Sequence, residues 1–85
     1  MLEFELVWQK ILELEGEEFW QLRGKGFKYK VSGNSLILST TNYSIPKSQA
    51  EAAWRKMPLK GPGQINDLVA PSYLFALLSD TRVTN

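Results

Sequence analysis

The hydrophobic pattern of this chain changes its period near residue 18, and this change limits the fold more than any other feature. Between residues 2 and 15, apolar side chains recur at the i, i+3, i+4, i+7 spacing that places them along one stripe of a helix. Between residues 18 and 39, apolar and polar side chains alternate, which is typical of strands with one buried side. The sequence therefore predicts an N-terminal helix followed by antiparallel strands.

The N-terminal helix is expected over residues 2–15. Glu3 and Glu5 lie in its first turn, where carboxylates complement the helix dipole. Gly16 is suited to the left-handed backbone that often ends a helix. The predicted buried stripe consists of Phe4, Val7, Trp8, Ile11 and Leu12.

Three β-prone runs follow, at residues 19–23, 27–31 and 35–39. Short segments rich in Gly and Asn separate them, as in hairpins. We expect an antiparallel three-stranded meander, with Tyr43-Ser44-Ile45 as a possible extension. Within the second run, Lys28 and Lys30 alternate with apolar residues, so one side of this strand should be cationic.

Two C-terminal helices are expected after the meander. Ser48 and Glu51 have the spacing of a capping box at the start of the first, and Pro58 should stop it. Its predicted buried stripe is Ala50, Ala53, Trp54 and Met57. The second should run from Pro71-Ser72 to about Asp80, and its segment 73–78 is apolar on every side. Such a helix must be enclosed by its own chain or by a second subunit.

The whole chain of 85 residues is predicted to form a single α+β domain over residues 1–85. The expected order is α-β-β-β-α-α, with both C-terminal helices packed on one face of the sheet. The other sheet face would then lie open to solvent.

The composition restricts the chemistry of the chain. It contains no Cys and no His, which excludes disulfides, thiolate metal sites and every mechanism that needs an imidazole base. We therefore expect no enzymatic activity, no cofactor and no metal. The acidic N-terminus does not resemble a signal peptide, and the longest apolar stretch, residues 68–78, is too short for a bilayer. A soluble, cytoplasmic protein without a membrane partner is expected.

Charge is distributed unevenly along the chain. Residues 1–18 carry six Glu and one Lys, whereas residues 19–60 carry eight Lys and Arg and one Glu. Such separation points to a charged partner, and a basic β-surface can follow a phosphate backbone. The leading hypothesis is a non-enzymatic module that binds nucleic acid (DNA) through a basic sheet face. The candidate contact residues are Arg23, Lys25, Lys28, Lys30 and Lys47. The alternative is that these residues form an ordinary solvated strand face.

A second hypothesis assigns the apolar last helix to a homodimer or to an interface with another protein. Its candidate residues are Tyr73, Phe75 and Leu77. Of the three tryptophans, Trp8 and Trp54 are expected in the core, because they lie on helical stripes. Phe19 and Trp20 point to opposite sides of a strand, so one of them is expected on the outer face.

Asp80 and Arg82 follow the last helix. We interpret them as a structural ion pair and not as a functional site.

Overall fold

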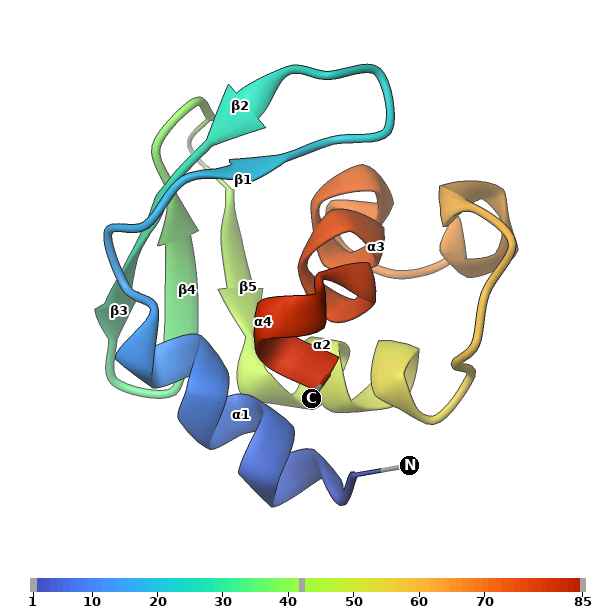
Figure 1. The fold of residues 1–85 in the computed structure, drawn as a ribbon, viewed down its shortest axis with the longest axis horizontal. Helices are drawn as coiled ribbons and strands as arrows, with labels where there is room; N and C mark the ends of the chain where they lie inside the picture. The colour runs from blue at the N-terminus through green and yellow to red at the C-terminus, as the bar shows by residue number, and fades with distance from the viewer. Residues whose placement is uncertain (1, 42, 85) are drawn as a thin grey trace.

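The computed structural model describes residues 2–41 and 43–84. Two small antiparallel sheets and the C-terminal helices enclose a shared core, and the N-terminal helix lies across one end of it (Figure 1). The chain is a compact α+β domain, as the sequence predicts at this level.

Helix α1 spans Phe4–Glu13 and buries Phe4, Val7, Trp8 and Ile11, which confirms most of the predicted stripe. It is shorter at both ends than expected. Gly16 has the predicted positive φ of 87°, and its N–H donates to the Tyr29 carbonyl at 3.2 Å. The turn after α1 is thereby attached to the sheet.

The β-region forms two sheets where one meander was expected. Strands β1 (Phe19–Trp20) and β2 (Gly26–Phe27) pair with each other, and a three-stranded sheet follows in the order β3-β4-β5. The strands of this larger sheet are β3 (Tyr29–Ser32), β4 (Ser35–Leu38) and β5 (Ser44–Pro46). The predicted extension at Tyr43–Ile45 is thus confirmed as a strand of this sheet, shifted by one residue to Ser44–Pro46, whereas the first predicted strand is not part of it.

The first hairpin leaves the plane of the larger sheet because it covers helix α3 (Pro71–Ser79) (Figure 1). Its strands are short, since the loop begins at Gln21, whose N–H donates to the Lys25 carbonyl at 2.9 Å. Gly24 completes this loop with φ of 88°, a conformation that favours glycine.

The predicted alternation along the strands is confirmed. Tyr29, Leu36 and Ile45 are buried in the larger sheet, whereas Lys30 and Ile37 are exposed. The pairing register places Lys30 opposite Ile37 and Ile37 opposite Ser44, so these three residues form a row across the outer face.

Helix α2 spans Lys47–Trp54, and the predicted capping box does not form. The helix starts directly after β5, with extended Pro46 as its N-cap, so Ser48 already lies in the first turn and makes no cap hydrogen bond. The Lys47 N–H is engaged by the Asn34 carbonyl at 2.7 Å. Pairing of the sheet therefore sets the start of the helix. The helix also ends before Met57, which lies half-buried against the core.

The C-terminal region is completed by a short 3-10 helix η1 (Pro62–Ile65) and by α4 (Thr81–Thr84), neither of which was predicted. Helix α3 agrees closely with its predicted range, and its own chain encloses it. Leu74, Leu77 and Leu78 are at most 1% exposed. Trp8 and Trp54 are in the core, as expected. In the part of the chain that the structure describes, no helix is long and apolar enough to cross a membrane.

Candidate nucleic-acid interface

The outer face of β3 and β4 carries a cationic hollow. Lys28, Lys30, Ile37 and Ser39 contribute to its lining, together with Gly16 and the neighbouring strand residues, around a volume of about 420 Å³. The hollow is held by the strand pairing, because the Ser39 N–H donates to the Lys28 carbonyl at 2.9 Å and the Ser39 hydroxyl accepts from the Lys28 N–H at 2.9 Å. Both lysines are exposed.

Neither Lys28 nor Lys30 forms an ion pair within residues 2–41 and 43–84. The Glu15 carboxylate, at the edge of this strand, accepts a hydrogen bond from the Val31 N–H at 2.6 Å. This contact holds Glu15 at the edge of β3. The two ammonium groups therefore remain open to an anionic partner.

Trp20 is the exposed member of the Phe19/Trp20 pair, with 56% of its surface accessible, whereas Phe19 is fully buried. Trp20 pairs with Gly26, and a Cβ on Gly26 would lie 3.4 Å from the indole nitrogen. The indole thus lies over a glycine that leaves room for it. Because side chains alternate along an extended chain, Trp20 and Gly26 lie on the outer side of this hairpin, opposite the buried Phe19 and Phe27.

Glu18 shares this surface. A Cβ on Gly26 would lie 2.5 Å from one of its carboxylate oxygens. The surface is therefore mixed in charge at the Trp20 end and cationic at the Lys28 and Lys30 end.

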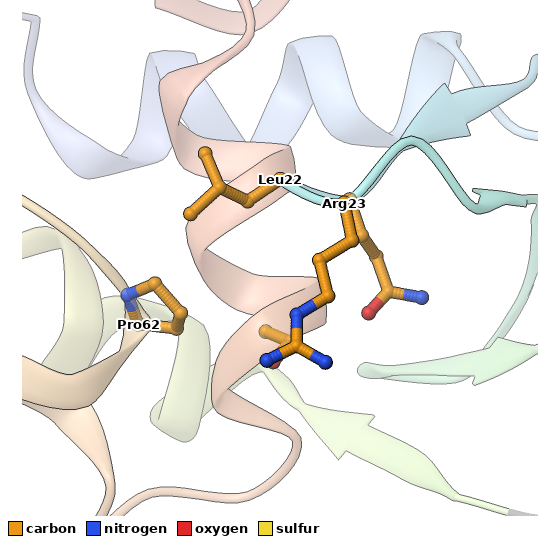
Figure 2. A pocket seen from close by; sticks show the side chains of 5 residues that line it. Leu22, Arg23 and Pro62 are labelled. Atoms are coloured by element: carbon orange, nitrogen blue, oxygen red, sulfur yellow. The ribbon is translucent and has the colours of Figure 1, made fainter.

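The other three predicted basic residues do not join this surface in the same way. Arg23 lines a separate hollow between the β1–β2 loop and α3. Figure 2 shows its side chain reaching over that helix. Lys25 is exposed in the same loop. Lys47 pairs with Glu5 at 3.0 Å and lies 5.9 Å from the Trp8 ring centroid. That contact fixes Lys47 against α1.

The predicted partner residues on α3 are largely used within the chain. Leu77 is 1% exposed and belongs to the core, so its side chain is not available to a partner. Tyr73 packs edge-to-face against Phe27 at 4.9 Å, and its hydroxyl lies 3.0 Å from that of Thr40. Phe75 is half-buried against the core.

Asp80 and Arg82 form the predicted ion pair, with an Nη2–Oδ2 distance of 2.9 Å. The same guanidinium donates to the Glu18 carbonyl at 2.9 Å and lies 4.2 Å from the centroid of the Phe19 ring. The side-chain hydrogen bond from Arg82 lowers the pKa of Asp80. These contacts join the C-terminus to the segment that enters β1, which is a structural role.

Tyr29 is the one buried side chain with a strongly shifted pKa among the described residues, and burial raises that pKa. Its hydroxyl donates to the Ile11 carbonyl at 2.5 Å. No group of three or more Asp and Glu side chains in the described part of the chain could hold a metal ion.

Sequence reasoning missed Ile37 and the exposure of Trp20. Three consecutive apolar residues, Leu36-Ile37-Leu38, place an apolar side chain on each side of the strand. This pattern could have predicted an apolar residue on the outer face, where Ile37 lies. The alternation predicted that Phe19 and Trp20 point to opposite sides of the strand, but it did not predict which of them is buried.

Comparisons with known proteins add no assignment: no protein-family model, no curated protein and no solved structure matches this chain.

Proposed function

We propose that this domain is a non-enzymatic module that binds single-stranded nucleic acid on the outer face of its β-region. The observation that carries the proposal is the joint placement of Lys28 and Lys30 on one open face. The exposed Trp20 on the adjoining hairpin supports it. Lysines without intramolecular partners can neutralise phosphates, and each such contact releases counterions. An exposed aromatic ring offers a stacking surface to any base.

The apolar group beside the lysines supports the same proposal. Ile37 is 43% exposed in the row opposite Lys30 and gives a base or sugar an apolar contact. The hollow is bounded by strands and not by mobile side chains alone, so it is formed before any ligand arrives.

Replacing both Lys28 and Lys30 by Glu should abolish binding of an oligothymidine strand of about 16 nucleotides, the upper end of common site sizes. Trp20→Ala should weaken binding about 5- to 150-fold, equivalent to about 1–3 kcal/mol of stacking. Fluorescence anisotropy at salt concentrations from about 50 to 200 mM measures both effects. The logarithm of the association constant should fall linearly with the logarithm of the salt concentration, with a slope of about −0.7 for each phosphate contact.

Lys60→Glu is the matched control for the single variants Lys28→Glu and Lys30→Glu, because it makes the same charge change at an exposed position between α2 and η1, far from β3 (Figure 1). It should leave affinity nearly unchanged. Equal losses from Lys60→Glu and from either single variant would reduce the effect to net charge and contradict the proposed site. Absence of binding at the lowest salt concentration would contradict the function itself.

The homodimer hypothesis has less support in the geometry. It was motivated by an apolar run that needed enclosure, and the chain's own core provides this enclosure around Leu74, Leu77 and Leu78.

A further inference from the structure

Two hollows meet on the side of the molecule where α3 begins. The first has a volume of about 460 Å³ and is lined by Gln21, Leu22, Arg23, Pro62 and Ser72 (Figure 2). The second has a volume of about 690 Å³ and extends from β5 to the segment 68–73. Both hollows have Ser72 in their lining, so they adjoin at the start of α3, and together they are named here the α3 groove.

The α3 groove holds much of the exposed apolar surface. Leu22 is 74% exposed, Tyr43 is 58% exposed and Val69 is 36% exposed, and all three line it. Leu68 and Ala70 add further apolar lining. Exposed apolar side chains gathered along a groove indicate a binding surface.

Arg23 is the one charged side chain in the lining of either hollow. Within residues 2–41 and 43–84 it forms no ion pair and no side-chain hydrogen bond. Figure 2 shows the Arg23 guanidinium extending away from Leu22, whose side chain points toward Pro62. The charge complement of this groove is thus a single anionic group on an otherwise uncharged ligand.

The edge of β5 supplies the second recognition element. Leu38 donates to the Tyr43 carbonyl and Lys47 donates to the Asn34 carbonyl, so alternate residues of β5 pair with β4. The backbone of Ser44 therefore points away from the sheet, into the side that lines the groove. Pro46, the next outward residue, has no N–H, which limits pairing to a short segment.

The opposite edge of the sheet differs from this one. On β3 the Tyr29 carbonyl accepts from the Gly16 N–H at 3.2 Å, and the Val31 N–H donates to the Glu15 carboxylate at 2.6 Å. These backbone groups at the β3 edge already have hydrogen-bond partners within the chain, and native sheets commonly protect their edges in this way. The open edge lies where the apolar groove lies.

We propose that the α3 groove binds the extended C-terminal segment of a partner protein. The segment adds to the edge of β5 through the backbone of Ser44, its apolar side chains occupy the second hollow, and its terminal carboxylate pairs with Arg23. Strand addition gives affinity through main-chain hydrogen bonds, and pockets give specificity. A lone guanidinium beside an uncharged lining suits one carboxylate better than a polyanion, which needs several cations along its path.

The test uses an array of N-acetylated peptides about six residues long, a span of about 20 Å when extended. Apolar residues vary at each position, and every sequence is made with a free C-terminal carboxylate and with a C-terminal amide. We expect a subset of the free-acid peptides to bind, and amidation to weaken each of them by about tenfold or more. This comparison uses the unmodified protein, so it does not depend on whether a variant folds.

Variants then assign the contacts. Arg23→Gln should weaken the free-acid peptides to the level of the amides, whereas Lys25→Gln, a matched change in the same loop outside the lining, should have no effect. Ser44→Pro removes the outward N–H and should reduce binding of acids and amides alike, with thermal unfolding as the check on folding.

Four outcomes would overturn the proposal. One is an array without binders, and another is equal binding of acids and amides. The third is an Arg23→Gln variant that loses oligothymidine affinity as fully as the Lys28 and Lys30 double variant, which would assign Arg23 to nucleic acid. If amidated peptides that end in Glu bind as tightly as the free acids, recognition does not require the terminal carboxylate, which contradicts the proposal. Because the groove and the outer face are separate, loss of one activity leaves the other testable.

Discussion

Above pH 10 the free energy of unfolding should fall by about 1.4 kcal/mol per pH unit, because Tyr29 keeps its proton in the folded protein. The unfolded chain releases this proton near its ordinary pKa of about 10. In the folded state burial raises the pKa of Tyr29, whose side chain is 1% exposed. Above pH 10 the unfolded state therefore binds fewer protons, and stability decreases as pH rises.

The measurement is urea unfolding at pH values from 8 to 12, compared between the parent protein and Tyr29→Phe. The parent should lose about 2 kcal/mol between pH 10 and pH 12 from this residue alone. Tyr29→Phe should be about 1 kcal/mol less stable near neutral pH, because it loses the hydrogen bond to the Ile11 carbonyl, and should show a smaller alkaline loss.

Tyr43→Phe is the matched control, since Tyr43 is 58% exposed. It should follow the alkaline slope of the parent protein. An unchanged slope in Tyr29→Phe would contradict the assignment of the loss to the buried phenol.

The buried side of the sheet was predictable because alternation is a local property. Tyr29 stands between Lys28 and Lys30, and a two-residue period alone places it opposite them. The same rule predicted the shared face of the two lysines. The N-terminal helix followed equally from spacing, since Val7 and Ile11 lie one turn apart.

The division into two sheets was not predictable from local patterns. It depends on β1 and β2 packing over α3, a contact between segments about fifty residues apart. The capping box failed for a related reason. Ser48 and Glu51 have suitable spacing, but the pairing of β5 with β4 brings Pro46 to the position before the helix. Tertiary structure decided both cases.

The functional surfaces divide in the same way. Lys28 and Lys30 were assigned together from one strand. The α3 groove is built from the β1–β2 loop, β5 and the segment 68–73, and no sequence motif joins Arg23, Ser44 and Val69. The sequence analysis grouped Arg23 with the lysines, because the charge of a side chain can be read from the sequence. The direction in which the side chain points cannot.

Replacing Arg82 by Ala should lower the free energy of unfolding by about 2 kcal/mol, more than an exposed ion pair accounts for. An exposed pair alone contributes at most about 1 kcal/mol. Arg82 also donates a charged hydrogen bond to the Glu18 carbonyl and lies over the Phe19 ring, so its loss frees the segment that enters β1. Urea unfolding near neutral pH measures the effect.

Asp80→Ala separates the ion pair from the other contacts of Arg82. It should cost about 1 kcal/mol, because Arg82 can still reach Glu18 and Phe19. The pKa of Asp80 is lowered in the folded state, so the stability that depends on it is present above its ordinary pKa of about 4 and is lost as pH falls below that value. The Arg82→Ala variant should show a smaller acid-dependent loss, because the backbone N–H of residue 82 still donates to the Asp80 carboxylate at 2.9 Å. Equal costs for both variants would mean that the ion pair accounts for the whole effect and that the contacts with Glu18 and Phe19 add nothing to stability.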